Sequence, residues 1–173
     1  ANPDPALTSN DFYSRPWACA VVFKADGNNS NQHIWNMGEG AGSSDDNIYL
    51  RIDSTNQLYF GWGRQGALNE CAIGSIQTNK WYGVYIGHKG QRLSAGQATA
   101  ANLAAAFDIR ITNENISWVD PTYNYSNSSF WTAGSTGGRM DRSVTSKMSI
   151  GGRGANRSFH GKVASFVATT LRR

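Results

Sequence analysis

The chain has 173 residues, of which 39% are hydrophobic and 19 are glycine. This length and composition are typical of one globular domain with a substantial core, and they exclude a disordered or fibrous protein. The net charge is only +4, and no apolar run approaches the roughly 20 residues that span a bilayer, so no membrane partner is expected.

Residues 1–16 are predicted to form an N-terminal arm, and residues 17–173 the folded domain. The arm is polar with prolines near its start, which is typical of chain ends that are disordered unless they dock on a neighbour. It has neither the basic start nor the apolar segment of a signal peptide, and Ala1 is compatible with loss of an initiator Met or of a leader.

Short apolar or alternating segments, separated by turn-rich ones, predict antiparallel strands from residue 17 onward. These strands cover residues 17–24, 33–37, 48–52, 58–62, 71–76, 80–88, 107–112, 144–150 and 162–169. One short helix is expected over about residues 96–106, where alanine is frequent. The predicted fold class is all-β, a two-sheet antiparallel sandwich with one short helix.

Alternation along two of these strands predicts which side chains share a face. Tyr49 and Arg51 point to the same face of their strand, and Tyr85 is expected to face outward on a later strand. The residues expected on the opposite faces of these strands are Ile48, Leu50, Ile52, Tyr82, Val84 and Ile86.

Cys19 and Cys71 both lie in apolar, strand-like segments. Two cysteines do not make a disulfide framework, and buried free thiols are common. Free thiols are therefore favoured, with a disulfide between the two as the alternative.

The last stretch, residues 148–173, contains a short strand, a loop that opens with Gly151 and Gly152, and a second strand that begins near Gly161. Glycines suit such a loop because they allow positive φ angles and close backbone approach. We expect the two strands to pair with each other in antiparallel fashion.

Three segments carry a resemblance to a known family. They are the ending Ile150-Gly151-Gly152 with Phe159-His160-Gly161-Lys162-Val163, the strand at residues 79–86, and the hairpin at residues 48–62. Together they resemble the concanavalin A-like lectin/glucanase superfamily, in its laminin-G-like jelly-roll branch. The wealth of Asn, Ser and Gly and the Ala-rich insert are similar to versions in structural proteins of tailed bacterial viruses.

This resemblance implies a non-catalytic structural or recognition module. The expected role is a virion surface protein, a capsid decoration or tail-associated protein, that contacts other virion proteins or copies of itself and binds host carbohydrate. The expected location is then the virion. The alternative is a lectin-like, carbohydrate-binding domain of a secreted or surface adhesin, which would be extracellular.

The motifs of common enzymes are missing from the sequence. Glucanases of this superfamily carry closely spaced carboxylates on one strand, whereas Glu39, Glu70 and Glu114 are isolated. The G-x-G-x-x-G pattern at residues 61–66 leads into another strand and not into the helix that a dinucleotide site requires. We therefore predict that the chain is not an enzyme.

The best cluster of oxygen ligands is Asp45, Asp46 and Asn47, with Asp53 on the following turn. Calcium prefers such carboxylate and carbonyl oxygens, so it is the only candidate cofactor. The spacing matches no diagnostic calcium loop, and a solvated turn rich in Asx residues is the favoured interpretation.

Aromatic rings beside polar groups form the candidate glycan-binding set, because rings cover the apolar face of a sugar while polar groups bind its hydroxyls. The candidates are Tyr59, Arg64, Tyr85, Trp118, Tyr123, Tyr125 and Trp131, with Arg51 near the hairpin. For any single ring, packing of a long loop onto the sheet is the favoured alternative.

Beyond residue 136 the chain has eight Lys and Arg but one Asp and no Glu. Such a basic end can face nucleic acid, anionic glycan or an acidic partner. The cations are spread singly, so we favour a solvated sheet edge, where Lys and Arg discourage edge-to-edge pairing, and nucleic acid is not expected as a partner.

Overall fold

The computed structural model describes residues 16–27, 31–38, 47–64, 67–91, 102, 105–113, 131–132, 147–152 and 158–170. The strands are β1 (Pro16–Ala25), β2 (Gln32–Gly38), β3 (Asn47–Ile52), β4 (Gln57–Arg64), β5 (Ala67–Ser75), β6 (Trp81–Lys89), β7 (Phe107–Asn113), β8 (Trp131–Thr132), β9 (Lys147–Ile150) and β10 (Gly161–Thr170). Within the predicted helix, Asn102, Ala105 and Ala106 are helical. Nowhere in the described ranges is a helix long and apolar enough to cross a membrane.

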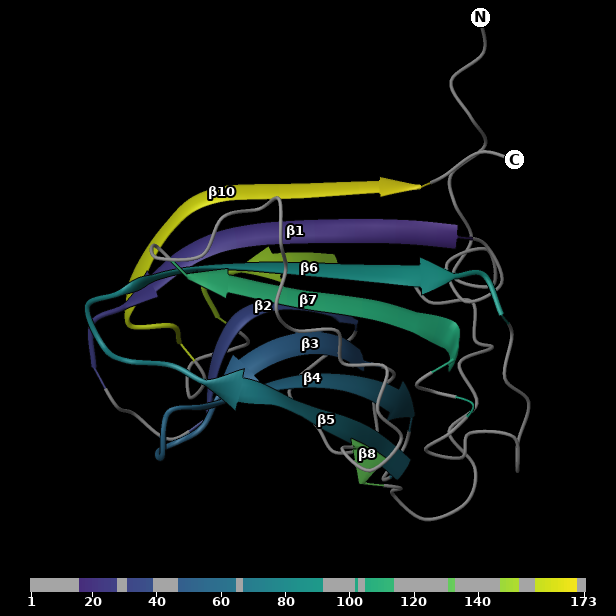
Figure 1. Cartoon of the computed structure of the whole chain (residues 1–173), viewed down its shortest axis with the longest axis horizontal. Coiled ribbons are helices and arrows are strands. Elements are labelled where there is room, and N and C mark those ends of the chain that lie inside the picture. The colour runs from purple at the N-terminus through teal and green to yellow at the C-terminus, as the bar shows by residue number, and fades with distance from the viewer. Residues whose placement is uncertain are drawn as a thin grey trace, which may run out of the picture.

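The strands form two antiparallel sheets that pack as a sandwich (Figure 1). One sheet has four strands in the order β10-β1-β6-β7, and the other has six in the order β8-β5-β4-β3-β2-β9. The predicted all-β, two-sheet antiparallel sandwich is therefore confirmed. Residues 1–15 of the predicted arm lie outside the described residues, and Pro16 already belongs to β1.

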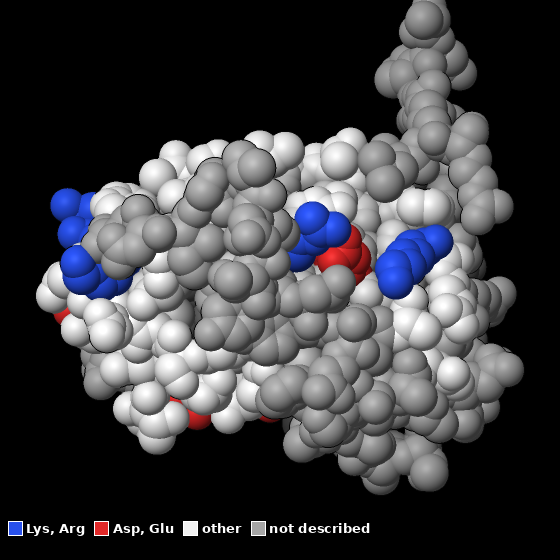
Figure 2. All heavy atoms as spheres, in the orientation of Figure 1, with Lys and Arg blue, Asp and Glu red and all other residues white. Residues whose placement is uncertain are grey.

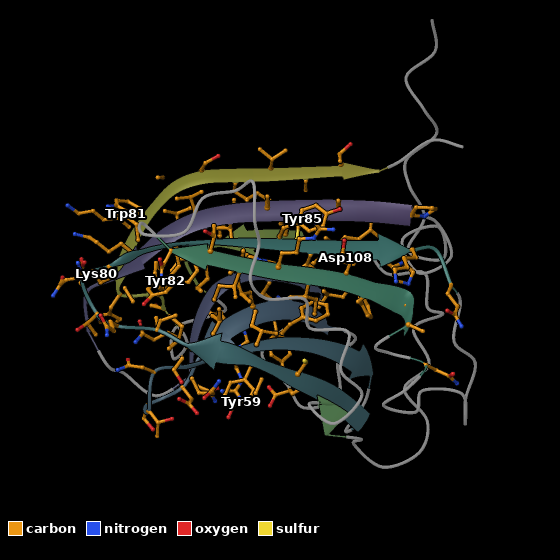
Figure 3. All side chains as sticks on the ribbon, viewed as in Figure 1. Tyr59, Lys80, Trp81, Tyr82, Tyr85 and Asp108 are labelled. Carbon is orange, nitrogen blue, oxygen red and sulfur yellow. The ribbon has the colours of Figure 1, made fainter. Side chains whose placement is uncertain are left out.

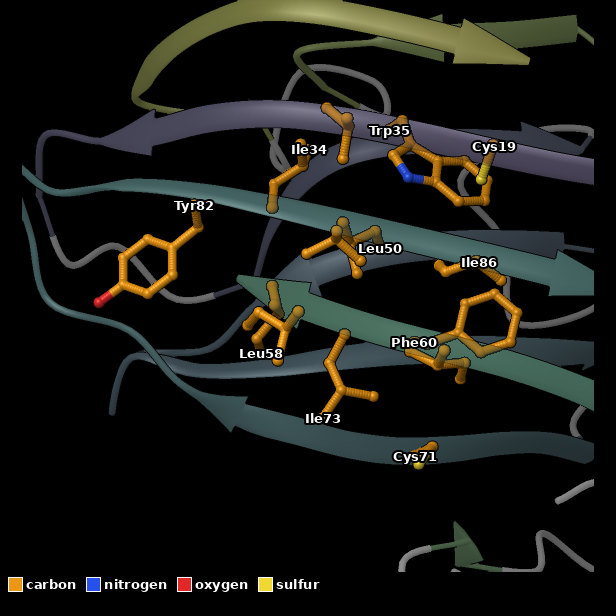
Figure 4. Packing of buried hydrophobic residues seen from close by; sticks show 14 of the residues in the cluster. Cys19, Ile34, Trp35, Leu50, Leu58, Phe60, Cys71, Ile73, Tyr82 and Ile86 are labelled. Carbon is orange, nitrogen blue, oxygen red and sulfur yellow. The ribbon is translucent and has the colours of Figure 1, made fainter. Parts of the chain in front are cut away.

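The core lies between the sheets and is built from alternate residues of each strand. Figure 4 shows Leu50 and Leu58 of the six-stranded sheet in the same layer as Ile86 of the four-stranded sheet. Phe60 and Phe107 meet across the sheets edge to face, with ring centroids 5.1 Å apart. The residues predicted opposite Tyr49, Arg51 and Tyr85 all belong to the core cluster, whereas Tyr49 is buried (3% exposed) but does not, which agrees with the predicted alternation.

The two cysteines are free and buried. Cys19 belongs to β1 and Cys71 to β5, so they lie in different sheets. The structure therefore agrees with the favoured interpretation of free thiols.

The predicted pairing of the last two strands is wrong. β9 pairs with β2 and β10 pairs with β1, so each is the edge strand of a different sheet. The connection is held where it crosses between the sheets: Gly151 N donates to Ile34 O at 2.8 Å, and His160 N donates to Gln32 Oε1 at 2.9 Å. These bonds tie both ends of the connection to β2, and Phe159 N also donates to Gly151 O at 2.9 Å, although the strands that follow these ends pair in different sheets.

Candidate functional site

The outer face of the six-stranded sheet carries polar side chains in two cross-strand rows. Direct partners in a ladder point to the same face of the sheet. The first row runs through Ser149, Asn36, Tyr49, Gly61 and Glu70. The second row runs through His33, Arg51, Tyr59 and Ala72.

Tyr49 reaches across a whole strand because Gly61 has no side chain. A Cβ atom placed on Gly61 would lie 2.2 Å from Tyr49 Cζ, so the ring lies directly over this glycine. The Tyr49 hydroxyl then donates to Glu70 Oε1 at 2.5 Å, although β4 separates the two strands. His33 packs against the same ring, with centroids 4.9 Å apart.

Arg51 joins this contact into a network. Its Nε atom donates to Glu70 Oε1 at 2.7 Å, and its Nη2 atom donates to Glu70 Oε2 at 2.8 Å. This bidentate ion pair fixes the plane of the guanidinium. The guanidinium also lies 4.3 Å from the centroid of the Tyr59 ring. We call Tyr49, Arg51, Tyr59 and Glu70 the Arg51 network.

Electrostatics keep the network in one protonation state. Burial acts to raise the pKa of Glu70, but hydrogen bonds from Arg51 and Tyr49 outweigh it and hold that pKa below its usual range. Burial, and then the charge of Glu70, raises the pKa of Tyr49. At neutral pH the network therefore contains a carboxylate, a neutral phenol and a guanidinium.

This arrangement suits recognition of polar ligands. Both oxygens of Glu70 accept bonds within the network, so the carboxylate acts to position Arg51. Arg51 has five N–H donors, and those that do not face Glu70 are of the kind that bind hydroxyl or carboxylate oxygens. One face of Tyr59 is covered by Arg51, and its hydroxyl hydrogen-bonds with Asp53, so the edge of the ring is the part left for a ligand.

Tyr59 and Tyr85 lie on opposite sides of the molecule. Figure 3 shows Tyr59 on β4 of the six-stranded sheet and Tyr85 on β6 of the four-stranded sheet. Opposite Tyr85 in the ladder is Arg110, whose Nη2 atom pairs with Asp108 Oδ2 at 3.0 Å. Both tyrosines face outward, so one glycan site cannot contain both.

The other sequence-derived candidates are only partly described. The candidates outside the described residues are Asp45, Asp46, Trp118, Tyr123 and Tyr125. Arg64, Trp131 and Asn47 belong to strands β4, β8 and β3, but their side chains are not described.

Asp53 of the proposed calcium cluster is engaged in its own turn. Its Oδ1 atom accepts bonds from Thr55 N at 2.8 Å, Thr55 Oγ1 at 2.7 Å and Gln57 N at 2.9 Å. In the part of the chain that the structure describes, no group of three or more His, Cys, Asp or Glu side chains is placed to hold a metal ion. Asp53 therefore acts as a turn residue in the described structure.

Sequence reasoning missed Tyr49 and Glu70 as site residues. Glu70 is isolated along the chain, and only the sheet brings it to Arg51, 19 positions away. The sequence signal that could have indicated Tyr49 is the alternation that places Tyr49 and Arg51 on one face, together with Gly61, which has no side chain, in the neighbouring strand.

No family model matches this chain, and no curated protein sequence does. Two structures of Trypanosoma rangeli sialidase, one with 2,3-difluoro-KDN and one with 2,3-difluorosialic acid, match with TM-scores of 0.51 and 0.52 and 14% identity. They cover 93% of this chain but only 22% of the sialidase chain. A heptameric SAP-like pentraxin from Limulus polyphemus gives a TM-score of 0.44 at 13% identity, over 92% of this chain and 66% of its own.

The prediction that the chain is not an enzyme, which was based on missing sequence motifs, is contradicted by the structural similarity to a sialidase. The sandwich of the chain is similar to part of a sialidase, and one of the matched structures is described as a covalent intermediate. At 14% identity this likeness shows a shared β-sandwich fold alone, so it assigns no reaction to the chain.

Proposed function

We propose that this chain is a laminin-G-like recognition module that binds a surface carbohydrate on the outer face of its six-stranded sheet. The observation that carries the proposal is the Arg51 network, in which a guanidinium is held by a carboxylate and stacked on a tyrosine. Sugars combine apolar faces with many hydroxyls, and a fixed array of donors beside a ring complements both.

Preorganisation strengthens the proposal. A free arginine loses much rotamer freedom when it binds a ligand, but Glu70 and Tyr59 already hold Arg51 in one orientation. Its side chain is 16% exposed and that of Glu70 is 23% exposed, whereas Tyr49 and His33 on the same face are buried, so a ligand would reach the network at Arg51 and Glu70.

A glycan array, first with calcium and then with chelator, tests the proposal, followed by affinity measurements on the best ligand. Tyr59→Ala should weaken binding roughly tenfold, about 1.4 kcal/mol, because the ring and the support of Arg51 are lost. Tyr85→Ala is the matched control, since it removes a similarly half-buried tyrosine from the opposite outer face. Equal losses in both variants, or a loss in Tyr85→Ala alone, would contradict this site.

A structural role on a virion is the second candidate, as a capsid decoration or tail-associated protein. The observation that favours it is β10, a ten-residue strand at the edge of its sheet with Lys162 as its one charged residue. Val167 on this strand is 58% exposed. A long edge strand with so little charge offers its backbone to another chain.

Sedimentation of the purified chain tests this second role. Val167→Lys should reduce self-association, because a buried charge at a strand-to-strand contact is costly. Gln91→Lys is the control, since it adds the same charge at an exposed position outside β10. If the two variants associate as strongly as the parent chain, β10 is not the contact.

A further inference from the structure

A second cluster lies at one end of the four-stranded sheet, away from the Arg51 network. Lys162 of β10, Lys24 of β1 and Trp81 of β6 are direct neighbours in one cross-strand row. Lys80, which is exposed, precedes Trp81. Figure 2 shows Lys and Arg atoms at the left end of this face, where Figure 3 labels Lys80 and Trp81.

The placement of Lys24 opposite Lys162 is unfavourable for folding. Like charges on directly opposed residues of an antiparallel ladder destabilise the pair, since their Cβ atoms lie about 5 Å apart. Asp26 Oδ1 is 4.0 Å from Lys24 Nζ, but its side chain is 46% exposed, and a surface contact of this length stabilises little. An anion between the two ammonium groups would remove the repulsion.

The aromatic ring in this row indicates what kind of anion fits. Lys24 Nζ lies 5.8 Å from the centroid of the Trp81 ring, so the positive charge and the indole share one surface. We infer that this corner binds an acidic saccharide, with its carboxylate or sulfate group between Lys24 and Lys162 and a sugar ring against Trp81. The inference does not rest on the proposed function, because it concerns a different sheet and a different face.

The size of the cluster favours a saccharide over nucleic acid. Proteins that bind nucleic acid through its backbone neutralise many phosphates along a track, with roughly 6–10 contacts. Here Lys24 lies over a single indole and Lys162 lies opposite Lys24 in the same row, an extent that one or two sugar units would cover. Nucleic acid is therefore the alternative outcome of the test.

The first measurement needs no ligand. Lys162→Gln should raise the melting temperature of the chain at low salt, because it removes the opposed like charges. Lys89→Gln is the matched control, since Lys89 is an exposed lysine near the opposite end of β6, and it should leave the melting temperature unchanged. A lower melting temperature in Lys162→Gln would overturn the argument from repulsion.

The second measurement uses a sulfated heparin hexasaccharide, its desulfated form and a single-stranded oligonucleotide as probes. Binding of the sulfated probe should fall at least tenfold in the Lys24→Gln, Lys162→Gln double variant and several-fold in Trp81→Ala, and should persist in Lys89→Gln. An equal loss of probe binding in Lys89→Gln would mean a nonspecific charge effect and would overturn the inference. Failure of the parent chain to bind the sulfated probe would overturn it as well. Tighter binding of the oligonucleotide would replace the saccharide by nucleic acid, and unchanged binding in Trp81→Ala would remove the ring from the site.

Discussion

At the residue scale, the most informative position is Glu70, whose carboxylate accepts bonds from Tyr49 and Arg51. A partly buried carboxylate costs folding free energy unless it is paired with a donor or a cation. Here both of its partners lie on β3. The same contacts position the guanidinium that we propose as the ligand-binding group. A change at Glu70 therefore affects both stability and binding.

The first prediction concerns pH. The folded-state pKa of Glu70 lies below its ordinary value of 4.5, so its carboxylate stabilises the fold above that pH, and the contribution is lost as pH falls through the folded-state pKa. Glu70→Gln should be less stable than the parent chain near pH 7, and the difference should shrink in acid. Urea unfolding from about pH 7 to about pH 3 measures this. The lowered pKa of Asp53 acts in both proteins, so a constant difference would contradict the assignment to Glu70.

The second prediction concerns the thiols. Burial raises the pKa of Cys71 to about 12 and also raises that of Cys19, so neither forms a thiolate near neutral pH. A thiol-specific chromogenic reagent should label neither cysteine in the native chain and both in urea. Rapid labelling of the native chain would show that one thiol is accessible.

At the scale of elements, the Arg51 network depends on the register of β3, β4 and β5. Tyr49 pairs with Gly61, and Gly61 pairs with Glu70, so the tyrosine reaches the carboxylate only across a position without a side chain. A shift of one residue in either ladder would turn these side chains to the core face.

The third prediction follows from this register. Gly61→Ala should destabilise the fold by about 1–3 kcal/mol and displace the Tyr49 ring, because the new methyl group would overlap it. Gly27→Ala is the control, since a Cβ atom there would meet nothing within 4 Å. Chemical denaturation of both variants measures the difference, and equal stabilities would show that the ring moves aside at no cost.

At the scale of the whole molecule, one core joins the two sheets. Phe107 of β7 contacts Phe60 of β4 across the sandwich and also packs edge to face against Trp17 of β1, at 6.3 Å. Since both sheets bury their apolar faces against each other, neither should remain folded alone.

The fourth prediction tests this cooperativity. Unfolding followed by far-ultraviolet circular dichroism and by tryptophan fluorescence should give coincident transitions. Phe107→Ala should shift both transitions together, with a loss of about 3–5 kcal/mol. Separate transitions would mean that one sheet persists without the other.

Strand positions and buried faces were predictable because they are local patterns. The alternation that buries Val84 and Ile86 in the core and leaves Tyr85 half-buried on the other face is visible within a few residues. The candidate site was predictable only in part: Tyr59 was recognised as an outward ring, whereas Glu70 is remote along the chain from its partner Arg51. Side chains of other candidates, such as Trp118 and Trp131, lie outside what the structure describes.

By itself, the sequence determined that this chain forms short alternating strands with one apolar face each, and such strands bury those faces as a two-sheet sandwich. Only the tertiary structure decided which strands become neighbours. It separated β9 from β10 and set Tyr59 and Tyr85 on opposite faces. It also brought Glu70 to Arg51 and Lys24 to Lys162. Strand pairing joins residues far apart in the chain, and local periodicity carries no information about that choice.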